Sequence, residues 1–352
     1  MAAQIVPFTP DLLPAVAAFS KEVWARPEDE AYFAWRYLDC PSQIGWLAME
    51  DGACTAMLWA FRRPYQIGDR RVTCLDTFDW FALPSRRGAL LGIRLAQALM
   101  KRPEPIVAVG GSAETLGLLP RLQWSTVGEV TPFVLPLEGG RFGAFVERRL
   151  RIPASVGRAI FRATARPWFA AGGGARRPGP GAQTLAAAAF DAAIVELYAG
   201  ERGYALLPVP DPDLMAWLLG GPASLGTLVL LRFVSGGDLR GWSLSRVCDA
   251  GALRDATILD LFARGDDARG YDWIVAETVA ALRAHQPDTI HATASAAPLR
   301  QALQRARFLP RSPLPVRWWP GPVTLPALPI HLGNNTSDTA IFPHPTGRTD
   351  PA

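Results

Sequence analysis

The chain has 352 residues, which is long for one domain and comfortable for two. Hydrophobic residues make up 49% of it and twelve are tryptophan, so it can fill a sizeable core. No stretch approaches the ~20 apolar residues of a membrane span, and the N-terminus lacks a basic region followed by an apolar run, so we expect a cytoplasmic protein without a signal peptide.

Cysteine and histidine are few and scattered. The four cysteines show no pairing and no CxxC spacing, which favours reduced thiols, and the four isolated histidines predict no metal site. These residues are Cys40, Cys54, Cys74, Cys248, His285, His291, His331 and His344.

The chain begins with a predicted helix and hairpin. Apolar residues at helical spacing predict a helix over Pro10–Trp24, and the aromatic segment EAYFAWRYLDCP follows. Residues 45–63 predict a hairpin with Asp51-Gly52 as its turn. A second turn at Gly68-Asp69 leads into the next strand.

The chain is organised around the stretch from Cys74 to Lys101. Its first ten residues predict a buried strand, Pro84 closes it, and an Arg-Arg-Gly turn leads into an amphipathic helix. Backbone N–H groups converge on an anion where a strand runs through such a turn into a helix N-terminus. The pattern therefore predicts a phosphate-binding turn, and its alternative is an ordinary strand-turn-helix.

The run from Phe81 to Gly92 resembles motif A of the GNAT acyltransferase superfamily. The resemblance implies that the turn binds the pyrophosphate of acyl-coenzyme A, and that strand residues bind its pantetheine arm. Leu90 stands where the family usually has a glycine, and its Cβ restricts φ and close backbone approach. The implied coenzyme-binding residues are Phe81, Ala82, Leu83, Arg86, Arg87, Gly88, Ala89, Leu90, Leu91 and Gly92.

Two further segments resemble the same family. Residues 105–111 predict a short strand parallel to its predecessor. Residues 114–124 then resemble the fourth helix of the family, with Leu119 where many members carry a tyrosine that acts as general acid. Leucine cannot donate a proton, so another group or water is needed. The segment Trp35-Arg36-Tyr37 is similar to one in GNAT proteins from bacterial polysaccharide and secondary-metabolite gene clusters.

Residues 138–185 predict a basic Gly/Pro/Arg-rich linker with short helices. Residues 141–177 contain nine arginines and one acid, Glu147, a net charge of +8 within a chain of net charge +4. Such a block indicates a surface for phosphates, an acidic partner or a membrane face, or else a solvated linker. The tail, 343–352, is expected to be disordered.

The second half repeats the first at an offset of 184, where Leu75-Asp76-x-Phe78 recurs as Leu259-Asp260-x-Phe262. We therefore expect an α/β fold of two GNAT-like units, 1–137 and 186–342, unless two unrelated α/β domains share a generic pattern. Each unit is expected to hold a mixed, mainly antiparallel sheet with a central parallel pair, flanked by helices. Asp266 and Asp267 would repel a pyrophosphate in the second copy, so coenzyme binding is assigned to the first.

Three carboxylates are candidate catalytic groups by position: Asp76, Asp79 and Glu114. Asp79 is expected to face the opposite side of the strand from Asp76, and Asp76 has a structural alternative because Asp260 repeats it. The acceptor side is assigned to Tyr32, Trp35, Tyr37 and Ser112. Their alternatives are core packing for the aromatics and a helix N-cap for Ser112.

The sequence thus predicts an N-acyltransferase. It would move an acetyl or other short acyl group from acyl-CoA to an amine, of the amino sugar or amino acid class, by direct attack in a ternary complex. One alternative is a non-catalytic GNAT scaffold that binds a nucleotide-sugar or a protein. Another is an acyl carrier protein-dependent acyltransferase, in which the arginine block docks the acidic carrier. Neither a metal nor a nucleic acid is expected.

Overall fold

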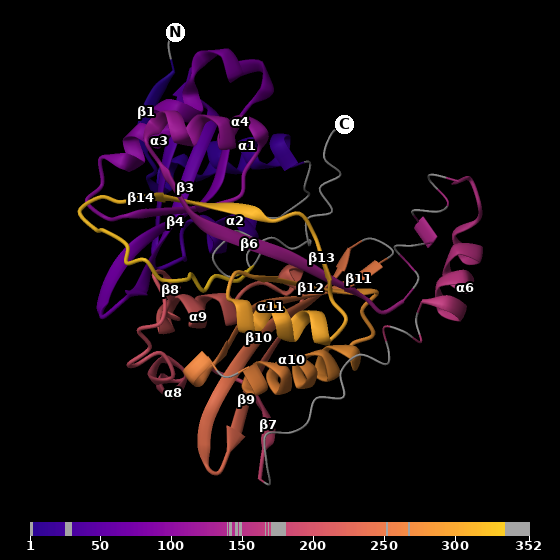
Figure 1. Ribbon diagram of the computed structural model, residues 1–352. Helices are drawn as coiled ribbons and strands as arrows, with labels where there is room; N and C mark the ends of the chain where they lie inside the picture. The colour runs from indigo at the N-terminus through magenta and orange to yellow at the C-terminus, as the bar shows by residue number, and fades with distance from the viewer. Residues whose placement is uncertain are drawn as a thin grey trace.

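Two α/β units share one continuous sheet in the computed structural model (Figure 1). The structure describes residues 3–24, 30–138, 140, 143–144, 147, 150–165, 167, 169, 181–250, 253–266 and 268–334. Most arginines of the predicted linker and the predicted disordered tail lie outside these residues. No helix among the described residues is long and apolar enough to cross a membrane.

The first unit follows the predicted order of helix, hairpin, strand, helix and strand. Asp51 and Gly52 both have positive φ (50° and 82°), as the predicted Asp-Gly turn requires. Its elements are β1 (Gln4–Pro7), η1 (Pro10–Leu12), α1 (Leu13–Trp24), α2 (Glu30–Tyr37), β2 (Gln43–Glu50), β3 (Ala53–Ile67), β4 (Arg70–Ala82), η2 (Pro84–Ala89), α3 (Leu91–Met100), β5 (Ile106–Val109), α4 (Ala113–Leu118), η3 (Leu119–Leu122) and β6 (Ser125–Pro136), where η denotes a 3-10 helix.

After a connecting helix, α6 (Ala154–Thr164), the second unit repeats the main strands and helices of the first in order, with the short strand β8 added between its first two helices and two strands at its end. Its elements are β7 (Gln183–Ala187), α8 (Ala192–Glu196), β8 (Leu207–Pro208), α9 (Pro212–Leu219), η4 (Ala223–Leu225), β9 (Thr227–Ser235), β10 (Asp238–Ala250), β11 (Leu253–Ala263), η5 (Arg264–Asp266), α10 (Ala268–Arg283), β12 (Thr289–Ala294), α11 (Ala297–Arg305), β13 (Leu309–Pro310) and β14 (Leu314–Trp319).

Geometry at matched positions repeats between the units. Trp124 donates its backbone N–H to the Leu119 carbonyl at 3.1 Å, and at an offset of 184 Phe308 donates to Leu303 at 2.9 Å. The residue before each donor, Gln123 or Arg307, has a left-handed φ of 63° or 69°. The offset that relates the two halves of the sequence therefore also relates two copies of one backbone arrangement.

The sheet runs in the order β1-β2-β3-β4-β5-β14-β6-β12-β11-β10-β9-β7. The parallel neighbours are β4 with β5 and β11 with β12, one pair at the centre of each unit, and the other strand pairs are antiparallel. The predicted fold class, two mixed and mainly antiparallel units with a central parallel pair and flanking helices, is confirmed.

The units exchange strands. The first half of β6 pairs with β14 in the first unit, and its second half pairs with β12 in the second. β14, from the far end of the chain, lies between β5 and β6 (Figure 1). The sheet of the first unit is thus completed by a strand from the second half of the sequence.

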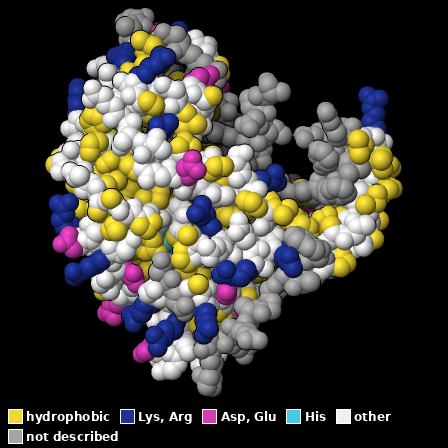
Figure 2. Space-filling view, viewed as in Figure 1, with side chains coloured by type: hydrophobic (Ala, Val, Ile, Leu, Met, Phe, Trp, Pro, Cys, Tyr) yellow, Lys and Arg dark blue, Asp and Glu magenta, His cyan; other side chains and the backbone are white. Residues whose placement is uncertain are grey.

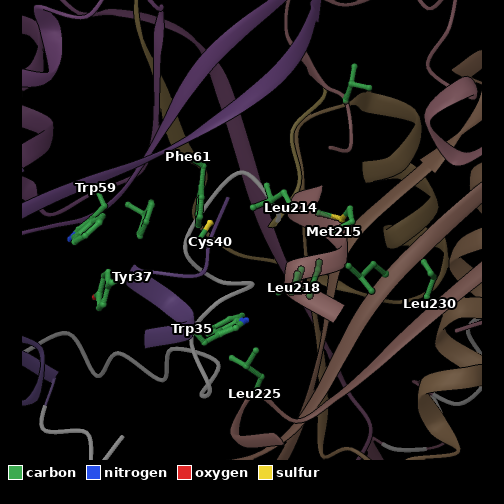
Figure 3. Close-up of a cluster of buried hydrophobic side chains, with 14 of the residues drawn as sticks. Trp35, Tyr37, Cys40, Trp59, Phe61, Leu214, Met215, Leu218, Leu225 and Leu230 are labelled. Carbon is green, nitrogen blue, oxygen red and sulfur yellow. The ribbon is translucent and has the colours of Figure 1, made fainter. Parts of the chain in front are cut away.

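Aromatic and aliphatic side chains from both units share one core (Figure 3). At its centre the rings of Trp35 and Trp217 stack with centroids 4.4 Å apart. Each indole N–H donates to the backbone carbonyl of the other tryptophan, at 3.2 and 2.9 Å. This reciprocal contact joins α2 to α9, the two helices that correspond between the units.

Candidate active site

The central parallel strands of the first unit separate after a short paired stretch. β4 and β5 pair at Leu75 with Ile106 and at Asp76 with Val107, and β4 then continues to Ala82. The register against β3 shifts between Met57 and Trp59, which places a β-bulge at Asp79, where φ is +45°. Pairing between β4 and β5 ends before this bulge, and the region between the carboxyl ends of the two strands, past the last paired residues, is called the cleft below.

Backbone alternation indicates which group of β4 faces this cleft. The Leu83 N–H donates to the Thr55 carbonyl on β3 at 3.0 Å. Because hydrogen-bonding groups of successive strand residues point to alternate sides, the Ala82 amide points away from β3, toward the diverging side. Of the three predicted pantetheine-binding residues, Ala82 is therefore the one whose backbone N–H points toward the cleft.

The predicted phosphate-binding turn lies at the mouth of the cleft. It is the 3-10 helix η2, and its residues Pro84, Ser85 and Arg86 are exposed; Arg86 pairs with Glu50 at 2.9 Å. The backbone of Arg87, Gly88 and Ala89 continues η2, and their side chains lie outside the described residues. The described side chains of the turn are exposed, and the turn leads directly into the N-terminus of α3.

Leu90 adopts the backbone conformation expected of a glycine. Its φ and ψ are 56° and 25°, and its side chain is 60% exposed. A left-handed leucine costs about 1–2 kcal/mol, and this exposed side chain offers little burial to offset that cost. Gly92, in the first turn of α3, lets the helix approach β4, since a Cβ there would lie 3.3 Å from the Trp80 indole nitrogen.

Asp79 is held in a buried ion pair that the sequence did not predict. Arg36 Nη2 lies 2.5 Å from Asp79 Oδ2, and the Tyr37 hydroxyl donates to the same oxygen at 2.8 Å. Arg36 also donates to the Tyr32 hydroxyl at 2.6 Å. Burial lowers the pKa of Arg36, but Asp79, Tyr32 and Tyr37 together raise it well above its usual value.

The expected orientation of Asp79 is wrong. Asp76 pairs across the strands with Phe61, whose ring stacks on Phe78, and the guanidinium of Arg36 lies 6.0 Å from the Phe78 ring. Asp79 therefore meets α2 on the same face of the sheet as Asp76. The physical reason is the bulge, which adds a residue and interrupts the alternation of side chains along β4.

Asp76 is also buried and partnered. The Tyr65 hydroxyl donates to its Oδ1 at 2.6 Å, and Arg63 Nε lies 3.6 Å from its Oδ2. Burial raises the pKa of Asp76 from 3.8 to about 6, against the opposing effects of Arg63 and Tyr65. A carboxyl with this pKa can accept a proton near neutral pH, but its side chain is only 1% exposed.

This pKa shift predicts that Asp76 makes the protein less stable as pH rises. Between pH 4 and 6 the folded state holds a proton on Asp76 that the unfolded state has released, so stability falls across this range. The full effect is about 3 kcal/mol, at 1.36 kcal/mol per pKa unit. Urea unfolding from pH 4 to 7 should show a smaller fall for Asp76→Asn than for the wild type. Asp51→Asn, in the exposed hairpin turn, should keep the wild-type slope, and an unchanged slope in Asp76→Asn would contradict the assignment.

Ser112 and Glu114 lie just beyond the carboxyl end of β5 and are exposed. Ser112 is the N-cap of α4, because its Oγ accepts the Thr115 N–H at 3.2 Å, and it also donates to Glu114. The capping alternative for Ser112 thus has direct geometric support. Leu119 is fully buried in the core beneath α3, so it does not face the cleft.

The predicted acceptor-side aromatics belong to the core. Tyr32, Trp35 and Tyr37 are at most 7% exposed, and Figure 3 shows Trp35 and Tyr37 among side chains from both units. They support the bulge through Arg36 and Asp79 rather than line an open surface. Arg36 could have been singled out from the sequence, since it follows Tyr32 by one helical turn on an otherwise aromatic face. Its pairing with Asp79 could not have been predicted.

The corresponding cleft of the second unit is filled. β11 and β12 pair from Asp255 to Thr257 and then separate. Into that gap comes the segment 330–334: Asn334 donates to the Ile258 carbonyl at 2.7 Å, and Leu332 and Ser295 exchange hydrogen bonds. Only a small enclosed space lined by His331 and Asp260, among others, remains. The side chains of Asp266 and Asp267 lie outside the described residues.

Within the described residues no group of His, Cys, Asp and Glu side chains is arranged to hold a metal ion. The features that define the first-unit site are backbone features: a bulged strand, two diverging parallel strands, and a turn into a helix N-terminus.

This arrangement is the fold of GCN5-related N-acetyltransferases, and comparison with solved structures supports the assignment. A GCN5-related N-acetyltransferase from Anabaena variabilis matches with 13% identity and a TM-score of 0.59, over 90% of this chain and 72% of that chain. N-myristoyltransferase from Saccharomyces cerevisiae, solved with bound myristoyl-CoA, matches with 12% identity and a TM-score of 0.60, over 91% of this chain and 79% of that chain. No family model and no curated protein matches the sequence. The predicted resemblance is confirmed at the level of the fold, and the two-unit arrangement is consistent with the second match.

Proposed function

We propose that the chain is an N-acyltransferase that uses acyl-CoA and acts through its first unit. The observation that carries this proposal is that pairing between the parallel strands β4 and β5 ends after Asp76, and that β4 then runs through the turn η2 into the N-terminus of α3. A helix N-terminus favours a pyrophosphate, and the cleft gives a pantetheine arm an edge of β4 to pair with. The filled cleft of the second unit supports the assignment to the first.

The reaction is direct attack of an amine on the thioester in a ternary complex, with an amino sugar or amino acid as the acceptor class. The Ala82 amide, aimed into the cleft, is the proposed donor to the oxyanion of the tetrahedral intermediate. Asp76, with its pKa raised to about 6, and the exposed Glu114 are the candidate proton acceptors. Asp79 is a positioning residue, because its carboxylate is engaged by Arg36 and Tyr37. Ser112 lies beside Glu114 on the proposed acceptor side.

A charge placed at Leu90 tests this function. Leu90→Asn and Leu90→Asp both suit the left-handed backbone, so both should stabilise the protein by about 1 kcal/mol. They differ only in charge. Isothermal titration calorimetry with acetyl-CoA should show binding to the wild type and to Leu90→Asn. Binding to Leu90→Asp should be about 10- to 100-fold weaker, because the carboxylate opposes the pyrophosphate.

A thiol-release assay against a panel of amino sugars and amino acids then tests catalysis. Binding without thiol release would favour the alternative of a non-catalytic scaffold, which the buried Leu119 supports because it supplies no general acid. Equal binding by Leu90→Asp and Leu90→Asn, or no binding of acyl-CoA by the wild type, would overturn the proposed site.

A further inference from the structure

The connecting helix α6 carries two apolar faces, and only one of them packs on the protein. Phe161 and Gly157 are buried, with the Phe161 ring stacked against Phe169 at 6.0 Å. Val156 and Ile160, four residues apart on a different face, are 44% and 47% exposed. A single stripe is enough to attach a helix to a core, and the second stripe is left about half exposed.

Exposed apolar side chains are concentrated here. Four of the ten exposed large hydrophobic side chains of the described residues lie within eleven positions: Leu150, Ile152, Val156 and Ile160. Helix α6 projects from the body of the molecule, and yellow side chains follow its outer edge (Figures 1 and 2). The stripe is therefore presented on a convex, accessible arm.

Basic side chains lie on the same arm, on the other side of α6 from Val156 and Ile160. Arg151, Arg158 and Arg162 are exposed, and residues 150–165 contain no acid. Arg158 and Arg162 are four residues apart, and they line a surface hollow with Ser155 and two alanines. Arg162 also contacts Glu138 at 3.1 Å. The exposed small residues of this hollow thus have the arginines on one side and the aliphatic stripe on the other, groups that match the phosphates and acyl chains of a lipid surface.

We propose that residues 150–162 bind the surface of an anionic membrane, with the apolar stripe in the acyl region and the arginines on the phosphates. A protein partner fits less well, because Leu and Val are under-represented at protein hot spots and the four exposed side chains include no aromatic residue. This inference does not depend on acyl transfer, since its measurement is membrane binding.

Co-sedimentation of the full chain with lipid vesicles tests the proposal. The protein should bind vesicles of phosphatidylcholine with phosphatidylserine and leave vesicles of phosphatidylcholine alone largely unbound. Arg151→Glu/Arg158→Glu/Arg162→Glu should weaken binding by about 100-fold, at roughly 1 kcal/mol per basic residue near the surface. Val156→Ser/Ile160→Ser should weaken it as well, because the stripe must enter the acyl region.

Leu185→Ser/Leu328→Ser is the matched control, because it removes two exposed apolar side chains away from the arm and should leave binding unchanged. Circular dichroism of each variant checks that the fold is intact. Equal binding to both kinds of vesicle, or no binding to either, would overturn the proposal. Capture of soluble polyglutamate without vesicle binding would also overturn it and assign the arm to an acidic protein.

Discussion

Arg36→Met is expected to lower the free energy of unfolding by about 3–5 kcal/mol, because it leaves the Asp79 carboxyl group without its cationic partner inside the protein. Both side chains of this pair are at most 1% exposed, and their 2.5 Å contact joins α2 to the bulge of β4. Urea unfolding at neutral pH measures the loss. The matched control is Arg62→Met, whose pair with Glu104 is also short, at 2.7 Å, but leaves Arg62 41% exposed. That variant should lose less than about 1 kcal/mol.

A double-mutant cycle separates the pair from the packing around it. Asp79→Asn keeps an oxygen for Tyr37 and tolerates the left-handed backbone, so Arg36→Met/Asp79→Asn should regain much of the stability lost in Arg36→Met. A cost below about 1 kcal/mol for Arg36→Met, or no recovery in the double variant, would show that the ion pair does not hold the bulge. The result bears on function because the bulge lies on β4, the strand that borders the cleft proposed for the coenzyme.

Val316→Asp is expected to cost at least about 4 kcal/mol and to unfold both units together. Val316 is fully buried on β14, between Val109 of β5 and Gly128 of β6, and an aspartate there would be charged without a partner. β6 continues from this contact into the sheet of the second unit, so a defect at β14 reaches both units. Leu314→Asp, at a 37% exposed position of the same strand, is the matched control and should cost much less.

Hydrogen exchange gives the readout for each unit separately. In Val316→Asp, protection should fall in β4 and β5 of the first unit as well as in β11 and β12 of the second, and denaturant unfolding should remain a single transition. Loss of protection confined to the second unit, which is contiguous with Val316 in sequence, would contradict the strand exchange. The boundaries 1–137 and 186–342 remain a prediction about the two halves of the sequence, and the strand pairing shows that these halves share a sheet.

The predicted site was partly visible in the sequence. Pro84, the Arg-Arg-Gly turn and the apolar helix after it have local signals, and all three lie where the pattern placed them. The unusual Leu90 was also recognised, and its left-handed φ explains why glycine is expected there. The buried partners of the two aspartates were not predicted, because Arg36 and Arg63 lie in other elements and their burial depends on packing across the sheet.

By itself, the sequence determined the local elements, their order, the correspondence of the two halves at an offset of 184, and the turn that begins α3. These features depend on periodicity, turn chemistry and spacing, which act over a few residues or repeat along the chain. Only the tertiary structure decided the exchange of β6 and β14, the side to which Asp79 points, and the placement of residues 330–334 beside the parallel strands of the second unit. Those outcomes depend on strand pairing and buried charge between residues far apart in the sequence, where no local preference selects the partner.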